Sequence, residues 1–161
     1  MKPGPFSLTL LASGKEGRFF AIHFDGEPKN EFDALLDRFS YDDAPDLFAI
    51  DERINEMCER LGFRDVFFTS EDKYPTPLAA LRYNKGPHRV YCCRYGRDVL
   101  VVGGGGFKPD DADGLQDVPE LKKAYDLVRY VSDEIDRQRE SGALPNVYHL
   151  TDGQRFDPDA I

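Results

Sequence analysis

Apolar residues follow two different periods along this chain, and the changes between them predict the order of its elements. Residues 6–12 and 18–24 are apolar runs separated by a glycine-containing stretch, which is the pattern of a β-hairpin. Residues 32–39 carry apolar side chains at positions i, i+3, i+4 and i+7, the spacing of a short amphipathic helix with Asn30 as its N-cap. A second apolar stripe, over residues 47–61, predicts another helix that packs in the core.

Three further strands are predicted close together, at residues 78–83, 88–95 and 98–102. The turns between them are too short for parallel neighbours, so these strands should form an antiparallel meander. Four glycines follow the third strand, at residues 103–106. No Gly-Lys-Ser or Gly-Lys-Thr sequence comes after them, so a β-bulge or a strand-ending bend is favoured over a nucleotide-binding loop.

A long third helix is predicted over residues 121–135 by its apolar face. The preceding Asp117-Val118-Pro119-Glu120 has the form of a capping box, and Gly142 marks the end of the helix. Residues 146–161 are mostly polar, and we expect them to form a loose tail. The fold class is therefore α+β: an antiparallel β-sheet meander with two N-terminal helices and one long C-terminal helix packed on it. We expect residues 1–145 to form one domain, with the N-terminal hairpin as an addition to it.

Composition narrows the classes of function. The 161 residues carry a formal net charge of −9, so the surface as a whole repels nucleic acid, and binding of DNA by the chain alone is not expected. No apolar run reaches the roughly 18 residues of a membrane span, which predicts a cytoplasmic protein without a membrane partner. The three cysteines form no Cys-x-x-Cys pair and the histidines show no paired spacing, so neither a metal site nor a cofactor is predicted.

One segment runs against this acidic composition. Between residues 73 and 108 there are seven Lys or Arg residues and a single Asp. Along the middle strand, a period of two puts Arg89, Tyr91, Cys93 and Tyr95 on one face, where arginine could hold a phosphate and tyrosine could stack a base or move a proton. In a second interpretation, which also stays open, Tyr91 packs in the core and the basic side chains pair with surface carboxylates.

The order of motifs in this segment resembles the RelE/HigB superfamily of bacterial toxins, especially its phage-derived HigB-like branch. The matching features are an Arg-aliphatic-aromatic strand, a glycine-containing hairpin, an aliphatic strand, a Gly-Phe-Lys stretch and a helix that begins near Pro-Glu. In this sequence they are Arg89-Val90-Tyr91, Gly96, residues 99–102, Gly106-Phe107-Lys108 and Pro119-Glu120. The resemblance implies a RelE-like fold and a metal-independent endoribonuclease that acts on messenger RNA, as the toxin of a type II toxin–antitoxin pair.

The resemblance also suggests roles for single residues, some by position and the tyrosines and the histidine by their chemistry. The catalytic candidates are Arg82, Arg89, Lys108, Tyr91 and His88. The RNA-binding candidates are Lys85, Arg94, Tyr95 and Arg97. Two departures weigh against activity, because Ala80 stands where many relatives carry a basic residue and the acidic stretch 109–113 replaces the usual basic run.

Two functions from different classes therefore stay open. One is the endoribonuclease, with messenger RNA, the ribosome or a cognate antitoxin-like protein as its partner. The other is a RelE-like domain without catalysis that binds a protein or an RNA, and for both a homo-oligomer formed through a sheet edge stays open. The first function requires Arg82, Arg89 and Lys108 to converge on one open concave face with a Tyr or His within reach. The second is favoured if these residues point apart or are neutralised by carboxylates.

Overall fold

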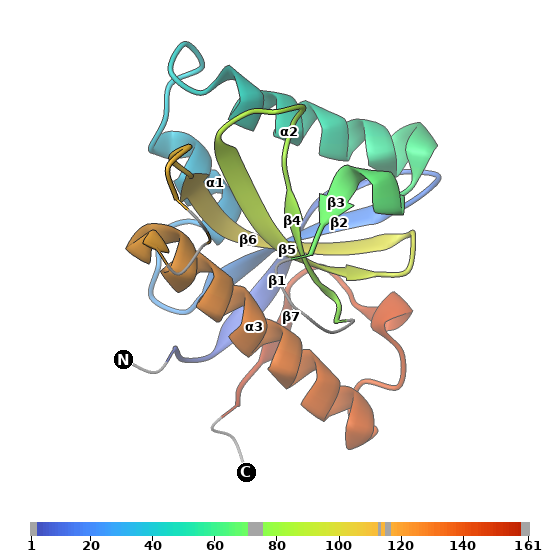
Figure 1. Cartoon of the computed structure of the whole chain (residues 1–161). Coiled ribbons are helices and arrows are strands. Elements are labelled where there is room, and N and C mark those ends of the chain that lie inside the picture. Colours follow the sequence, from blue (N-terminus) through green and yellow to red (C-terminus); the bar gives the residue numbers. More distant parts are fainter. Residues whose placement is uncertain (1–2, 71–75, 113, 115–116, 159–161) are drawn as a thin grey trace.

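A mixed β-sheet lies between helices in this protein, with α1 and α2 over one face and α3 over the other (Figure 1). The structure is a computed structural model that describes residues 3–70, 76–112, 114 and 117–158. The strands of this part of the chain are β1 (Phe6–Ser13), β2 (Arg18–Phe24), β3 (Phe68–Thr69), β4 (Leu78–Leu81), β5 (His88–Tyr95), β6 (Val99–Phe107) and β7 (Gln154–Phe156). The α-helices are α1 (Glu31–Asp37), α2 (Pro45–Glu56) and α3 (Pro119–Glu140), and a π-helical turn (Met57–Leu61) continues α2. Short 3₁₀ turns occupy Asp65–Phe67 and Val147–His149.

The mixed sheet corrects the expectation of purely antiparallel pairing. The strand order is β3-β4-β5-β6-β2-β1-β7. Strands β4, β5 and β6 are antiparallel neighbours as predicted, whereas β2 lies parallel to β6, with Arg18 opposite Val99 and Ala21 opposite Val102. Parallel pairing needs a long connection, and here two helices and three strands lie between β2 and β6. The N-terminal hairpin is therefore part of the central sheet.

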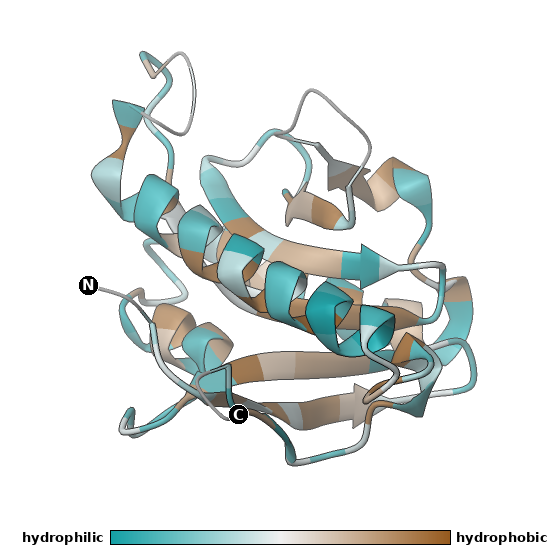
Figure 2. Ribbon diagram, turned by 90° about the horizontal axis from the view of Figure 1, so that it is seen from below, coloured by the Kyte–Doolittle hydropathy of each residue, from teal (hydrophilic) through white to brown (hydrophobic). Residues whose placement is uncertain are grey.

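A separate set of apolar side chains buries each face of the sheet. The face toward α3 includes Tyr91 and Val101, together with Val128 and Ile135 of the helix. The opposite face packs Val90, Cys92, Leu100 and Val102 against apolar residues of α1 and α2. Figure 2 shows the hydrophilic outer side of α3 and the more apolar strands behind it. Strands β4, β5 and β6 are thereby covered on both sides.

Apolar periodicity locates the three helices, but the cap predicted for α3 is wrong. Asn30 behaves as expected of an N-cap, because its side chain accepts a hydrogen bond from the backbone N–H of Asp33 at 2.8 Å. Helix α3 begins at Pro119 with Val118 in the N-cap position, and no side chain caps it. Glu120, the expected capping partner, forms an ion pair with Arg38 instead. This pair joins the start of α3 to the end of α1.

The C-terminal segment is ordered in the sheet, contrary to the loose tail that we expected. Strand β7 pairs antiparallel with β1, with Phe6 opposite Phe156. Leu150 and Phe156 are 0% exposed, and the Phe156 ring stacks on the ring of Phe6 at a centroid distance of 5.0 Å. The backbone N–H of Gly153 donates to the carbonyl of Leu8 at 2.7 Å. The end of the chain thus completes the core next to its beginning.

The glycine run lies inside β6 rather than after it. The pairing of β5 with β6 is irregular between Val90 and Cys92, which confirms the expected bulge, but the strand continues to Phe107. A Cβ atom on Gly103 would lie 2.4 Å from Cγ2 of Val128 in α3. The missing side chain at this position therefore lets α3 lie close against the sheet.

Candidate nucleic-acid interface

Two tyrosines that were expected to contact RNA lie beneath α3. Tyr91 is 0% exposed, and its ring packs edge-on against Tyr125 at a centroid distance of 5.5 Å. Tyr95 is 6% exposed, and burial raises the pKa of its hydroxyl, which keeps the group protonated. The period of two placed these tyrosines on one face with Cys93, and all three belong to the core under α3. Neither tyrosine is accessible to RNA.

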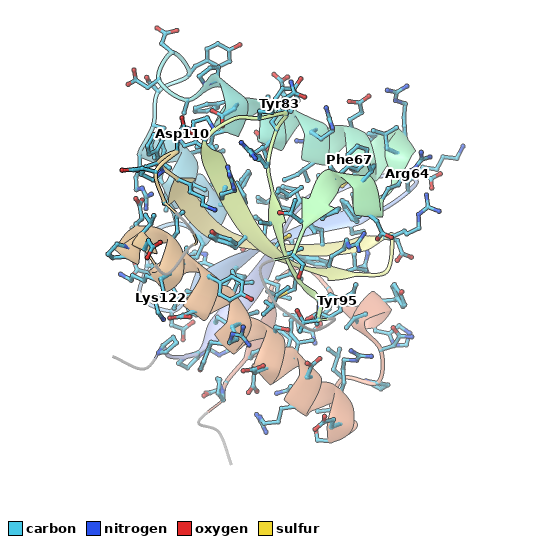
Figure 3. The ribbon with its side chains drawn as sticks, in the orientation of Figure 1. Arg64, Phe67, Tyr83, Tyr95, Asp110 and Lys122 are labelled. Carbon is cyan, nitrogen blue, oxygen red and sulfur yellow. The ribbon has the colours of Figure 1, made fainter. Side chains whose placement is uncertain are left out.

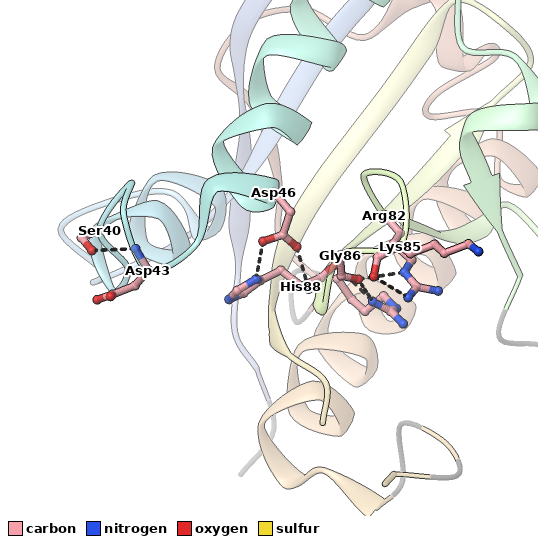
Figure 4. A network of polar contacts seen from close by, with 8 residues as sticks. Ser40, Asp43, Asp46, Arg82, Lys85, Gly86 and His88 are labelled. Atoms are coloured by element: carbon pink, nitrogen blue, oxygen red, sulfur yellow. Dashed lines mark hydrogen bonds and ion pairs between the residues drawn. The ribbon is translucent and has the colours of Figure 1, made fainter. Parts of the chain in front are cut away.

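His88 begins β5 and is also buried, at 2% exposure. Asp46, in the first turn of α2, accepts a hydrogen bond from the His88 backbone N–H at 2.9 Å and contacts ring Nδ1 at 2.8 Å (Figure 4). The rings of Phe39 and Phe107 pack edge-on against the imidazole. A carboxylate at Nδ1 favours a proton on that nitrogen, so Asp46 fixes both the tautomer and the orientation of the ring.

Basic residues do meet at the turn between β4 and β5. We call Arg82, Lys85, Arg89 and Lys108 the basic turn. Arg82 Nε and Arg89 Nη1 both donate to the carbonyl of Gly86, at 2.8 and 2.9 Å, and Arg82 Nη2 donates to the carbonyl of Lys85 at 3.0 Å (Figure 4). The backbone N–H of Lys108 donates to the carbonyl of Pro87 at 2.8 Å, which brings the end of β6 beside the turn. Carbonyl acceptors hold the Arg82 guanidinium in place without neutralising its charge.

Arg94 and Arg97 lie at the opposite end of β5, about 20 Å away by the rise of a strand. Arg94 forms an ion pair with Asp65 at 2.5 Å, and its guanidinium lies over the ring of Phe68 at 4.9 Å. An open cavity of about 420 Å³ is present here, and we call it the basic cavity. Its lining residues are Arg64, Asp65, Arg94, Gly96 and Arg97. The structure therefore divides the predicted basic residues between two sites.

A row of aromatic side chains and arginines, which the sequence pattern did not predict, lies between these two sites. The Arg53 guanidinium, from α2, lies over the ring of Tyr83 at 5.0 Å and over the ring of Phe67 at 5.2 Å. Phe68 follows Phe67 and carries Arg94 on its ring. We call Tyr83, Arg53, Phe67 and Phe68 the aromatic row. All four are partly exposed, and Figure 3 shows Tyr83, Phe67 and Arg64 following one another along one side of the molecule.

Several basic residues of the basic turn, the aromatic row and the basic cavity form no ion pair with a described carboxylate. Many basic residues elsewhere form ion pairs, such as Lys29 with Asp37, Lys122 with Asp126 and Arg155 with Asp25. Within the part of the chain that the structure describes, six basic residues here have no carboxylate within ion-pair distance. They are Arg53, Arg64, Arg82, Lys85, Arg97 and Lys108. In an acidic protein these charges are available to an anionic partner.

The cysteines offer no reactive site. Cys58, Cys92 and Cys93 are free and buried. Burial raises the pKa of the Cys58 thiol to about 11 and that of Cys93 to about 12, so the nucleophilic thiolate is scarce at neutral pH. Among the described residues, no three His, Cys, Asp or Glu side chains lie close enough together to hold a metal ion.

No protein-family model, curated protein or solved structure matches this chain significantly. The resemblance to the RelE/HigB superfamily rests on the sequence pattern and stays a prediction. None of the helices in the described ranges is both long and apolar enough to cross a membrane. The fold and the site together define an α+β protein whose central strands are covered on both faces and whose basic turn and basic cavity lie at opposite ends of β5.

Proposed function

We propose that this protein is a small RNA-binding module that holds the phosphate backbone at the basic turn and does not cleave the RNA. The observation that carries the proposal is the convergence of Arg82 and Arg89 on the single carbonyl of Gly86, beside Lys85. Arg89 is buried, at 9% exposure, so a bound phosphate would contact the exposed Arg82 and Lys85, and the Arg89 guanidinium beneath them would add its positive charge. Among anionic ligands we propose RNA, because the proteins that this sequence resembles act on messenger RNA.

The net charge of −9 is compatible with such a module if binding is local. The rest of the acidic surface repels a polyanion at a distance, and salt screens that repulsion beyond about 10 Å. Contacts at the basic turn release counterions from the RNA and therefore weaken as salt concentration rises. The proposal thus requires a modest affinity with a clear dependence on salt.

Burial of the candidate proton-transfer groups supports binding over cleavage. A general acid or base must come within hydrogen-bond distance of the atom it serves. Tyr91 and Tyr95 lie under α3, and His88 lies between two phenylalanine rings with Nδ1 against Asp46. These three candidates are therefore out of reach of a phosphate at the basic turn. Tyr83, which follows Arg82, is partly exposed, but the Arg53 guanidinium lies over its ring.

Replacing Arg82 and Lys85, the two exposed residues of the basic turn, with alanine tests the proposal. We expect Arg82→Ala/Lys85→Ala to weaken binding of a fluorescein-labelled eight-nucleotide oligouridylate (U8) by about tenfold. The slope of log K against log salt concentration should become less negative by about 1.4, because two phosphate contacts to a single strand are lost. Fluorescence anisotropy over a salt series measures both quantities. Lys15→Ala/Lys122→Ala, which removes two exposed charges elsewhere, should leave both unchanged; an equal loss in this control would contradict a specific site.

The Asp46–His88 pair keeps the endoribonuclease as a second candidate, because it lies directly beside the basic turn. Under our proposal, induced expression of the wild type and of Arg82→Ala should leave bacterial growth equal at matched soluble levels. Mapping of RNA 5′ ends should then show no new cleavage sites. If the wild type arrests growth and Arg82→Ala does not, the endoribonuclease becomes the favoured function. His88→Gln would then test whether His88 transfers a proton.

A further inference from the structure

We infer that the bound RNA is a single strand that runs in extended form from the basic turn, over the aromatic row, to the basic cavity. This inference rests on the proposed function and adds to it the path, the strandedness and a second anchoring site.

The path links residues that contact one another or are neighbours in the chain. It begins at Arg82 in the basic turn, and the next residue, Tyr83, carries the Arg53 guanidinium over its ring. The same guanidinium lies over Phe67, and the ring of Phe68, one residue on, lies under Arg94. The contacts of Arg53 with Tyr83 and Phe67, and of Arg94 with Phe68, are direct. Arg82 is joined to Tyr83, and Phe67 to Phe68, as neighbours in the chain, so the aromatic row begins at the residue that follows Arg82.

The path ends in the basic cavity. Arg94 lines this cavity together with Arg64 and Arg97, neither of which has a described carboxylate partner. Asp65 is the acidic residue of the cavity, and its side chain is 92% exposed while it neutralises Arg94. The cavity therefore keeps two unneutralised arginines, enough to anchor a second phosphate.

The distance between the anchors sets the size of the ligand. Strand β5 separates them by about 20 Å. That length suits a segment on the order of four nucleotides, the lower end of the site sizes known for single-strand-binding folds. The partly exposed rings of Tyr83, Phe67 and Phe68 lie between the anchors, where the bases of such a segment would be.

Alternation of arginines with aromatic rings favours a single strand over other anions. Bases of a single strand can stack on aromatic side chains and on arginine planes, whereas a duplex keeps its base faces inside the helix. An acidic protein segment would use the arginines but has no base faces to place on the rings. The aromatic row would then add nothing to its binding.

The test uses U8 with the full-length protein and variants at the far end of the path. Arg64→Ala/Arg97→Ala should weaken U8 binding about tenfold and make the slope of log K against log salt concentration less negative by about 1.4. Phe67→Leu, which keeps an apolar side chain against the core, should weaken U8 binding about tenfold through lost stacking. Asp65→Asn should strengthen U8 binding, because this substitution removes the carboxylate that pairs with Arg94. The stoichiometry should be one U8 per protein, since one strand occupies both anchors.

The outcomes separate this inference from the proposed function. If Arg82→Ala/Lys85→Ala weakens binding while Arg64→Ala/Arg97→Ala and Phe67→Leu do not, the proposed function stands and the path is wrong. Two U8 per protein would also overturn the path, because the anchors would then be independent sites. An oligoglutamate of eight residues that displaces U8 as well as unlabelled U8 does would show a site for acidic protein and overturn the single-strand assignment. If wild type binds no U8, both proposals fail together.

Discussion

Phe156→Ala should lower the free energy of unfolding by about 3–5 kcal/mol, the cost of emptying a phenylalanine site in a core. Phe156 is 0% exposed and stacks on Phe6 with an angle of 11° between the rings. Loss of the ring leaves a cavity against Phe6 and weakens the pairing of β7 with β1. Urea denaturation followed by circular dichroism measures the change.

The neighbouring residue supplies the control for this prediction. Arg155 points to solvent, where both of its terminal nitrogens contact Asp25, at 2.8 and 2.5 Å. The pair is about half exposed, so Arg155→Ala should cost less than about 1 kcal/mol. Equal, small losses from both variants would mean that the C-terminal segment contributes nothing to the core and is loose after all.

Gly105→Ala should also destabilise the fold strongly, by about 3 kcal/mol. A Cβ atom on Gly105 would lie 1.9 Å from the carbonyl oxygen of Arg89 and 3.0 Å from Cα of Val90. Both are backbone atoms of the paired strand β5, so they cannot turn aside as a flexible side chain would. Strands β5 and β6 must separate locally, next to the bulge. The midpoint of thermal or urea unfolding measures the effect.

Gly4→Ala is the matched control, because no atom lies within 4 Å of the position that its Cβ would take. It should change the stability by no more than about 0.5 kcal/mol. If Gly105→Ala were as well tolerated as Gly4→Ala, β5 and β6 would not be as close at the bulge as described.

The sequence pattern predicted the positions of helices and strands better than it predicted which strands pair with each other. The spacing of Phe32, Leu35 and Leu36 and the apolar stripe from Leu47 locate α1 and α2 because helical periodicity is a local property. Parallel pairing of β2 with β6 is not local: the apolar runs at residues 18–24 and 99–102 say that each is a strand, but not that they are neighbours. The order of the tail was not predicted because its buried apolar residues, such as Leu150 and Phe156, follow no regular period.

The candidate site shows the same limit. Period two grouped Tyr91 and Tyr95 on one face, but the sequence could not say that α3 would cover that face. Arg82 and Arg89 are seven positions apart, close enough that a turn between them brings them together. Arg53 and Phe67 come from α2 and from the segment before β3, so only the tertiary structure reveals that they stack.

The sheet order has a consequence for the order of events during synthesis. Strand β2 pairs with β6, which is made about eighty residues later, and β1 pairs with β7, which is made only at residues 154–156. Contacts this distant along the chain slow folding, and a nascent chain carries the apolar hairpin of β1 and β2 with one edge of each strand unpaired until β6 and β7 have been made. The hairpin is therefore the segment on which a chaperone would act, and the native sheet closes only once Phe156 has left the ribosome.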